Sequence, residues 1–309
     1  MKILEHVPLA PMTTFKIGGT ARFLTKVSNE DELLDALVWA ESKNIEYCFL
    51  AGGSNILISD TGFDGLVINL NIHERTFDGA SVFLGAGNVL WNEILYTCNH
   101  GLAGWENLAG IPGSIGGAVR GNSGAFGVEI GDLIVSVRFY NTATKTFGEM
   151  KKEACDFGYR SSVFKKHPDL VIVRVALKLK NCNASVCCDN ATRIVSEREK
   201  RHIQNVKAAG SYFINPITSR EIQKMFEKEK EMKSRGGRVP AGWLIEKMGC
   251  KGVRVGGAIA SKQHPNYIVN IYGATAKDVR KLAQKIKKTA FDHFGVELQE
   301  EVSHIGERE

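Results

Sequence analysis

Two short segments carry side chains that could act on a carboxylate and on a reactive carbon. Arg160 follows Tyr159 in the run Gly-Tyr-Arg-Ser-Ser, and a planar guanidinium can bind a carboxylate through two parallel hydrogen bonds. Ser211 lies between Gly210 and an aromatic run, where its hydroxyl could approach a reacting atom. An exposed strand edge would explain the first segment equally well, and a tight turn would explain the second.

A third polar segment lies near the C-terminus and contains Glu300 and Glu301. Apolar residues flank the two carboxylates at strand-like spacing, namely Val296, Leu298, Val302 and Ile305. We therefore expect this segment to pack as a strand that turns one glutamate inward. Alternation does not decide which one, because Glu300 shares the parity of Val296, Leu298 and Val302 whereas Glu301 points the other way in an ideal strand.

Two glycine-rich runs could bind a flat or phosphorylated ligand. Residues 110–127 hold seven glycines in eighteen positions, and residues 51–55 read Ala-Gly-Gly-Ser-Asn directly after a predicted buried strand. Glycine lets a ligand approach the main chain closely, and successive N–H groups form a concave site that suits a pyrophosphate. Neither run is G-x-G-x-x-G at the start of a long helix, and the Walker pattern G-x-x-x-x-G-K-[ST] is absent. We therefore expect a nucleotide-like ligand in a fold other than that of the common dehydrogenases.

The composition is typical of a protein of two or three domains, with 309 residues of which 43% are hydrophobic. No apolar stretch suggests a membrane helix, and we expect no secretory signal. The seven cysteines contain no C-x-x-C pair and predict free thiols in a reducing cytosol. Part of the net charge of +6 comes from residues 193–207 and 277–288. We interpret these clusters as solvated helix faces, because no motif for nucleic-acid binding accompanies them.

The secondary-structure pattern mixes helices with short strands, which indicates the α+β class. One helix is expected to begin with Ser28 as its N-cap, and another covers about 91–100. The charge-rich helical stretch 192–207 is expected to mark a boundary, and the last helix, 276–294, has one apolar face and ends at Gly295. Strands are expected at 45–50, 55–59, 66–70, 81–84, 133–140 and 171–177.

Taken together, these segments resemble the UDP-N-acetylmuramate dehydrogenases, also called UDP-N-acetylenolpyruvoylglucosamine reductases, a flavoenzyme family of early peptidoglycan synthesis. The matching motifs follow the family's order along nearly the whole chain. They occupy residues 13–19, 51–57, 110–117, 158–162, 210–213, 241–246 and 301–306. The short interval between the Tyr-Arg segment and Ser211 resembles the family's shorter subtype, which lacks a tyrosine-bearing loop insertion.

The resemblance implies a two-lobed FAD-binding domain of the vanillyl-alcohol-oxidase or PCMH type, followed by a C-terminal α+β substrate-binding domain. The implied divisions are 1–65 for the first FAD-binding lobe, 66–195 for the second lobe and 196–309 for the substrate-binding domain. A C-terminal strand at about 296–306 is implied to return to the active site. We expect a cytoplasmic monomer that binds neither nucleic acid nor membrane.

FAD is implied to lie between the two lobes, with its pyrophosphate on the first glycine run. The residues implied to contact it are Gly52, Gly53, Ser54, Asn55, Ile111, Pro112, Gly113, Ser114, Gly117, Asn122, Ser123, Gly124 and Ala125. Some relatives of this fold attach flavin covalently through histidine. Neither glycine run contains a histidine, so we expect noncovalent FAD. The scattered cysteines give poor support to a zinc site, and we expect no metal.

The resemblance also implies a reaction in which NADPH reduces FAD, and FAD then reduces UDP-N-acetylglucosamine enolpyruvate to UDP-N-acetylmuramate. Arg160, helped by Glu301, is implied to stabilise charge on the substrate carboxylate, and Ser211 is implied to donate a proton to the α-carbon. The implied substrate-binding residues are Tyr159, Asn215 and, as a weaker candidate, His264. The alternative hypothesis is a flavin oxidase of the same fold acting on a sugar or hydroxy acid. It would use the glycine runs but would not explain Ser211 and Glu301.

Three positions depart from the family's usual pattern. Ile214 occupies a place that is often lysine, and Gln204-Asn205 occupies a place that is often Gln-Pro. Asn122-Ser123-Gly124 replaces the common Asn-Ala-Gly. The first two departures leave the diphosphate contacts near Ser211 open, and none affects the three implied catalytic residues.

Overall fold

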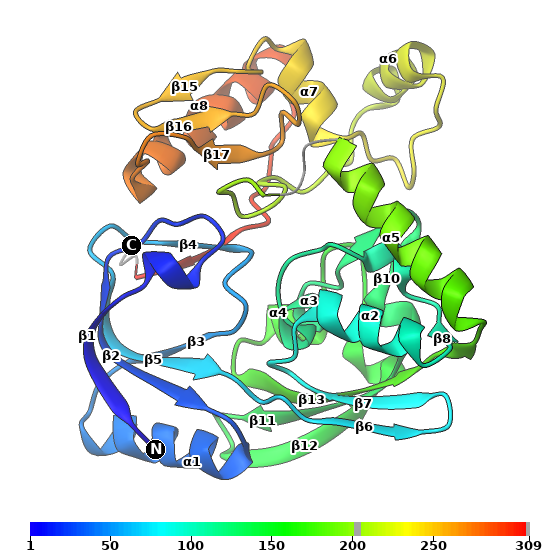
Figure 1. Ribbon diagram of the computed structural model, residues 1–309. Helices are drawn as coiled ribbons and strands as arrows, with labels where there is room; N and C mark the ends of the chain where they lie inside the picture. The colour runs from blue at the N-terminus through cyan, green and yellow to red at the C-terminus, as the bar shows by residue number, and fades with distance from the viewer. Residues whose placement is uncertain (201–204, 307–309) are drawn as a thin grey trace. The chain divides into compact units, whose positions relative to one another are not determined.

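The computed structural model describes residues 1–200 and 205–306. The chain divides into two compact units, which we describe separately (Figure 1). The first unit comprises residues 1–7, 22–53 and 64–200, and the second comprises residues 8–21, 54–63 and, of the described residues, 205–306. None of the helices in the described ranges combines the length and the apolar character that a membrane span requires.

A four-stranded sheet forms one part of the first unit, with helix α1 (Glu30–Ser42) packed on it. The strand order is β1 (Ile3–Pro8), β2 (Thr20–Val27), β5 (Phe63–Leu70) and β3 (Tyr47–Leu50). Strands β3 and β5 run parallel, and α1 connects β2 to β3 along the chain. Buried Leu33, Ala36 and Ala40 of α1 pack in one core with residues of β5.

The N-cap of α1 differs from the sequence prediction. Asn29 is the capping residue, and its side chain accepts a hydrogen bond from the backbone N–H of Glu32 at 2.9 Å. The backbone N–H of Ser28 instead donates to the Glu32 carboxylate at 2.7 Å. The prediction of Ser28 was therefore wrong by one residue, because two adjacent polar residues could both cap and only the chain path selects between them.

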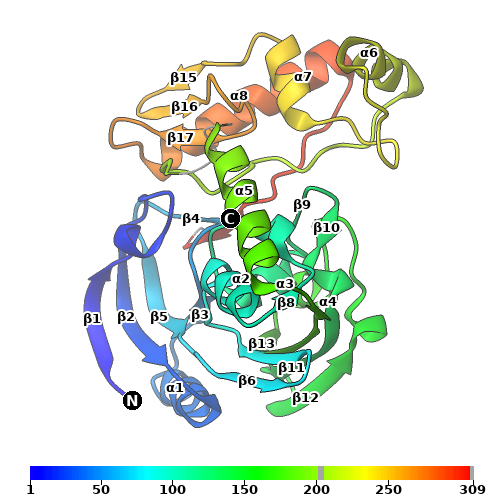
Figure 2. The same ribbon diagram turned by 45° about the vertical axis from the view of Figure 1, so that its right-hand side comes forward.

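A five-stranded antiparallel sheet forms the other part of the first unit. Its strand order is β12 (Thr146–Lys151), β11 (Ile134–Asn141), β13 (Leu170–Lys178), β7 (Ser81–Gly85) and β6 (Arg75–Asp78). Figures 1 and 2 show its helices gathered on one side of the sheet. These helices are α2 (Leu90–Asn99), α3 (Ile115–Arg120), α4 (Val163–Lys166) and α5 (Ala184–Lys200). The strands expected at 81–84, 133–140 and 171–177 and the helix expected at 91–100 are confirmed within one or two residues.

Short elements complete the first unit. Two small antiparallel pairs join β8 (Leu102–Ala103) to β14 (Lys180–Asn181) and β9 (Gly124–Ala125) to β10 (Val128–Glu129). Its 3-10 helices are η2 (Glu106–Leu108), η3 (Ile130–Asp132) and η4 (Lys152–Cys155).

Two details of this unit differ from the sequence expectation. The structure pairs Cys182 with Cys187 in a disulfide, whereas the cysteine spacing predicted free thiols, because the turn from β14 into α5 brings the two together. Helix α5 begins before the expected boundary helix at 192–207. Residues 201–204 of that prediction, including Gln204, lie outside the described residues.

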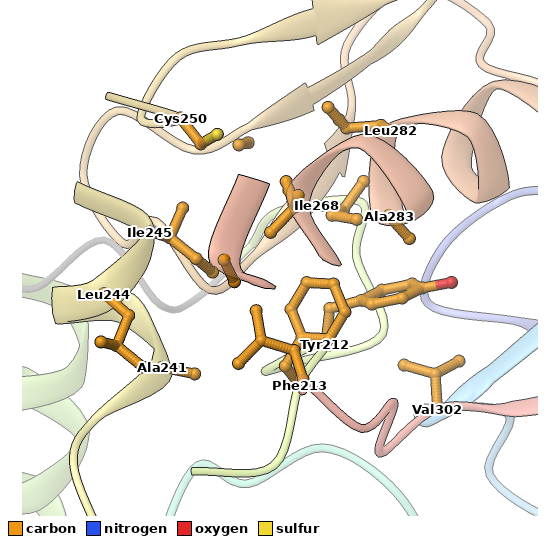
Figure 3. Close-up of a cluster of buried hydrophobic side chains, with 14 of the residues drawn as sticks. Tyr212, Phe213, Ala241, Leu244, Ile245, Cys250, Ile268, Leu282, Ala283 and Val302 are labelled. Atoms are coloured by element: carbon orange, nitrogen blue, oxygen red, sulfur yellow. The ribbon is translucent and has the colours of Figure 1, made fainter. Parts of the chain in front are cut away.

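The second unit is built on a three-stranded antiparallel sheet and three helices. The strands are β15 (Arg254–Val255), β16 (Ala258–Ala260) and β17 (Ile268–Asn270), and the helices are α6 (Arg220–Lys230), α7 (Ala241–Lys247) and α8 (Ala276–Phe294). Helix α8 starts with a capping box of Thr275 and Asp278 and ends at Gly295, whose φ is +61°. The predicted apolar face of α8 is buried, and Figure 3 shows Leu282 and Ala283 among the surrounding core side chains.

The C-terminal segment of the second unit forms two successive pairings. Residues around Glu300 lie antiparallel to Phe213, and β18 (Ser303–Ile305) then pairs in parallel with β4 (Ile56–Ile58). The unit also contains the 3-10 helix η1 (Ala10–Met12). The expected strand near the C-terminus is therefore present, although its regular part is short. Both units contain helices together with antiparallel and parallel strands, which confirms the α+β class.

Candidate functional site

The two glycine-rich runs meet within the first unit. A Cβ atom added to Gly52 would lie 2.7 Å from the Cα of Gly113 and 2.8 Å from the backbone nitrogen of Ser114. Gly53 and Gly113 both have positive φ, at +59° and +119°. These glycines are therefore required by close backbone approach and by left-handed geometry. The juxtaposition was not evident from two runs that are separated by some sixty residues in the sequence.

Helix α3 begins at this meeting point. The Ser114 hydroxyl caps it by accepting a hydrogen bond from the N–H of Gly117 at 3.2 Å. Gly116 packs against Ala86, whose Cβ would lie 2.8 Å from an added methyl group. Gly117, in contrast, is exposed. The helix therefore has a packed side and an open side, and the open side is lined by main chain.

The loop after α3 is fixed by one buried asparagine. Asn122 is 1% exposed, and its φ of +44° is in the left-handed region. Its Nδ2 donates to Glu129 at 2.6 Å and to the carbonyl of Gly158 at 2.9 Å, while its Oδ1 accepts from the N–H of Gly131 at 3.0 Å. The side chain of Asn122 is therefore used to hold the loop. If this loop contacts FAD, it does so through its main chain, because the Asn122 side chain is already engaged.

The structure brings Arg160 to this same loop. Its Nη2 donates to the carbonyl of Gly124 at 3.0 Å, and its guanidinium lies 5.3 Å from the ring centre of Tyr159. Arg160 has a φ of +55°, in a tight turn closed by two hydrogen bonds between Gly158 and Ser161 at 3.0 Å each. Non-glycine residues in left-handed conformation are often found at functional sites, where the surrounding structure fixes the direction of the side chain.

Ser211 and Glu301 lie on neighbouring chain segments of the second unit. The N–H of Glu301 donates to the carbonyl of Tyr212 at 2.8 Å, and the Asn55 side chain donates to the carbonyl of Glu301 at 3.2 Å. Gly210 precedes the serine with a φ of +80°. Both Ser211 and Glu301 are half-buried. The fold thus places a hydroxyl, a carboxylate and a residue of the Gly-Gly-Ser-Asn turn in one locality.

The two adjacent glutamates have different surroundings. Glu300 accepts hydrogen bonds from Tyr212 at 3.2 Å, from His304 at 2.9 Å and from Lys287 at 3.3 Å. Burial raises the pKa of Glu300, but His304 and Lys287 outweigh it, so that the pKa lies below the usual value. Burial, followed by the charge of Glu300, raises the pKa of Tyr212. Glu300 is therefore the glutamate of the internal network, which the alternation of the sequence left undecided.

Asn266 is a residue of this locality that the sequence analysis missed. It is 3% exposed, and its side chain accepts from the N–H of Phe213 at 3.0 Å and donates to the carbonyl of Phe213 at 2.8 Å. Its own carbonyl accepts from the N–H of Tyr212 at 2.7 Å. Asn266 therefore holds the two residues that follow Ser211. The only available signal in the sequence was an asparagine between His264 and the apolar residues that form β17.

The expected substrate-binding residues of the second unit are half-buried. Asn215 accepts a hydrogen bond at its Oδ1 from the N–H of Ala241 at 2.9 Å, at the start of α7. The ring of His264 packs edge-on against Tyr267, with 4.6 Å between the ring centres. Both side chains thus have structural contacts, and their binding roles stay predictions. In the described ranges, no cluster of three or more His, Cys, Asp or Glu side chains could hold a metal ion.

The first unit fits FAD in its chemistry. The meeting of Gly52 and Gly113 offers backbone N–H groups with no side chain in the way, and the open face of α3 begins beside it. Arg160, held on the Gly124 carbonyl, supplies positive charge at the loop that follows α3. These are the groups that a pyrophosphate and a polar ring system require.

Comparisons with known proteins agree along the chain. Residues 21–147 match the sequence model of an FAD binding domain, and residues 201–305 match that of the C-terminal domain of UDP-N-acetylenolpyruvoylglucosamine reductase. The chain is similar to the UDP-N-acetylenolpyruvoylglucosamine reductase of Solibacter usitatus, with 33% identity over 99% of this chain and 97% of the relative. The enzyme of that name from Bacillus subtilis is 32% identical over 99% of this chain and 94% of the relative.

A solved structure gives the same result for the fold. The crystal structure of UDP-N-acetylenolpyruvylglucosamine reductase from Thermus caldophilus matches with a TM-score of 0.77 and 31% identity, covering 99% of each chain. The match to the FAD binding domain agrees with the expected flavin-binding fold. With relatives above 30% identity over nearly its whole length, this chain belongs to the UDP-N-acetylenolpyruvoylglucosamine reductase family.

Proposed function

We propose that this protein reduces the enolpyruvyl group of UDP-N-acetylglucosamine enolpyruvate to give UDP-N-acetylmuramate, with NADPH as reductant and noncovalent FAD as cofactor. The observation that carries the proposal is the family relationship over 99% of the chain. The reaction is an early step of peptidoglycan biosynthesis. FAD supplies two-electron chemistry when bound, accepting a hydride from NADPH and passing it to the substrate double bond.

Arg160 and Glu301 are proposed to bind the substrate carboxylate and the charge that develops beside it. The tight turn and the Gly124 carbonyl hold the Arg160 guanidinium in a defined orientation. A preorganised donor of this kind contributes roughly 3–4 kcal/mol to an oxyanion-like transition state. The backbone pairing with Tyr212 fixes the position of Glu301, which is proposed to orient the same end of the substrate.

Ser211 is proposed to donate the proton that completes the reduction at the α-carbon. A serine hydroxyl is a weak acid, but an enolate is a strong base, so placement matters more than acidity. Support comes from the hydrogen bonds that hold Tyr212 on both sides, to Asn266 and to Glu301. They leave the preceding Ser211 half-buried, on a backbone with little freedom. Tyr159, Asn215 and His264 are proposed to hold the rest of the substrate.

The remaining proposals concern organisation. We propose that 1–65 and 66–195 act as two FAD-binding lobes. The two separate sheets of the first unit support two lobes, and β5 (Phe63–Leu70) spans the proposed boundary. Residues 196–309 are proposed to bind the substrate, with the segment at 296–306 contributing Glu301. NADPH and a UDP-sugar are metabolites of the cell interior, which is the reason for proposing a cytoplasmic enzyme. A monomer is proposed, to be checked by sedimentation.

The experiment that tests this function separates the two half-reactions of the Ser211→Ala variant. Anaerobic stopped-flow mixing with NADPH should bleach the flavin at the wild-type rate. Subsequent mixing with the enolpyruvyl substrate should restore the flavin colour roughly 100- to 10,000-fold more slowly. Ser42→Ala, at an exposed position at the end of α1, is the control and should leave both rates unchanged. A colourless wild-type protein would refute the flavin function, and unchanged half-reactions in Ser211→Ala would refute the proton-donor role alone.

A further inference from the structure

Arg120, the last residue of α3, is a half-buried cation for which the described residues provide no hydrogen bond or ion pair at the guanidinium. Burial lowers its pKa from the usual value. Other arginines of the first unit are paired through two hydrogen bonds, Arg75 with Glu93 at 2.6 and 2.7 Å and Arg138 with Glu30 at 2.6 and 2.8 Å. Because desolvating a charge is costly, a bound ligand is the simplest account of a half-buried guanidinium that the described residues leave unpaired.

The position of Arg120 on α3 indicates where that partner lies. Residues three apart share a face of a helix, so Arg120 lies on the same face as Gly117. Gly117 is the exposed residue of a helix whose other residues before Arg120 are buried. Arg120 therefore belongs to the open face of α3 that Gly117 marks, on the helix whose first end meets the main-chain groups that fit FAD.

The two ends of α3 have different chemistry. Its first end meets the Gly52 turn, which fits a pyrophosphate. Arg120 follows Ser114 by six residues, or about 9 Å along the helix axis, so it lies well away from that turn. Its backbone is fixed there, because the buried Ser162 hydroxyl donates to the Arg120 carbonyl at 2.7 Å. The loop contacted by Arg160 starts two residues later.

We propose that Arg120 is an FAD-binding residue that pairs with the isoalloxazine ring and favours the reduced cofactor. The inference rests on the proposed function. The ring of reduced FAD carries a negative charge at neutral pH, whereas the oxidised ring is neutral, so a nearby guanidinium binds the reduced form more tightly. The residue thereby raises the reduction potential of the bound flavin and makes hydride transfer from NADPH more favourable.

The test measures the flavin midpoint potential of the purified holoprotein by anaerobic dye-equilibration titration. Arg120→Met keeps an unbranched apolar stem and removes the charge, and it should weaken binding of reduced FAD relative to oxidised FAD at least tenfold. For a two-electron couple, a tenfold change equals about 30 mV, so the potential should fall by that amount or more. Arg120→Lys should lie closer to the wild type. Arg193→Met, which removes an exposed charge from α5 of the same unit, should not change the potential.

Several results would overturn the assignment while leaving the proposed function intact. An unchanged potential in Arg120→Met, together with an unchanged dissociation constant for oxidised FAD by fluorescence titration, would show that Arg120 only compensates the helix C-terminus. An unchanged potential with a raised KM for NADPH would assign the residue to the nucleotide substrate instead. If Arg120→Lys or Arg193→Met lowered the midpoint potential as much as Arg120→Met, the charge at Arg120 would not be the cause of the shift. A wild-type protein without flavin would instead refute the proposed function.

Discussion

Asn266 offers the sharpest test of how the fold positions Ser211. In Asn266→Ala, the N–H and the carbonyl of Phe213 both lose a buried hydrogen bond, of 3.0 Å and 2.8 Å. Leaving one buried polar group unsatisfied costs roughly 1–3 kcal/mol. We therefore expect the free energy of unfolding to fall by about 2–4 kcal/mol, which a domain of ordinary stability tolerates at low temperature.

The effect on catalysis should be confined to one half-reaction. Once Phe213 is released, the segment that carries Ser211 keeps the backbone hydrogen bonds of Tyr212 but loses two of its anchors, so Ser211 is held less firmly against the neighbouring Glu301 segment. A displacement of about 1 Å at a reacting group reduces the rate roughly 100-fold. Anaerobic stopped-flow should therefore show flavin reoxidation by the enolpyruvyl substrate slowed by about that factor. Flavin reduction by NADPH should stay within about twofold of the wild type, because it needs no proton from this serine.

A matched control separates positioning from loss of stability. Asn270 is also buried in the second unit, and its side chain donates to the carbonyl of Phe15 at 3.2 Å and accepts from the N–H of Ala274 at 2.8 Å. Asn270→Ala should cost a similar amount of stability while leaving reoxidation nearly unchanged. If Asn270→Ala slowed reoxidation as much as Asn266→Ala, or if Asn266→Ala left it at the wild-type rate, the positioning argument would be refuted.

Two further predictions concern flavin binding and acid stability. In Gly52→Ala, the added methyl group would lie 2.7 Å from the Cα of Gly113, so we expect strain of about 1–3 kcal/mol and at least tenfold weaker FAD binding. Flavin content and fluorescence titration measure the binding, and full flavin content would contradict the prediction. His304 and Lys287 outweigh burial and lower the pKa of Glu300. Ionised Glu300 therefore stabilises the fold at pH values above its ordinary pKa of about 4.5, and this stabilisation is lost as the pH falls through the lower pKa of the folded state. Urea unfolding between about pH 6 and pH 3 should therefore show a smaller acid loss in Glu300→Gln than in the wild type, by about 0.5–1 kcal/mol, and equal slopes would be evidence against the network.

Much of the fold could be predicted from local patterns in the sequence. The apolar face and the terminal glycine of α8 are readable because burial of a helix follows a period of 3.6 residues. The strands of the five-stranded sheet appear as short β-branched and aromatic runs, and the order of the glycine, Tyr-Arg and Gly-Ser motifs indicates the family. The glycines of the two runs could be picked out because their composition is unusual wherever they lie.

Tertiary structure alone decided which polar residues work together. Only the pairing of the C-terminal segment with Tyr212 and Phe213 separates the two glutamates. Glu300 enters an internal network, whereas the backbone of Glu301 pairs with Tyr212, the residue after Ser211. Asn266 and Arg120 have no distinctive sequence pattern. The role of Asn266 depends on hydrogen bonds to residues distant in the chain, and the proposed role of Arg120 depends on a bound ligand. The physical reason is that periodicity records which side of an element is buried. Hydrogen-bond partners and unpaired charges depend instead on how distant segments meet.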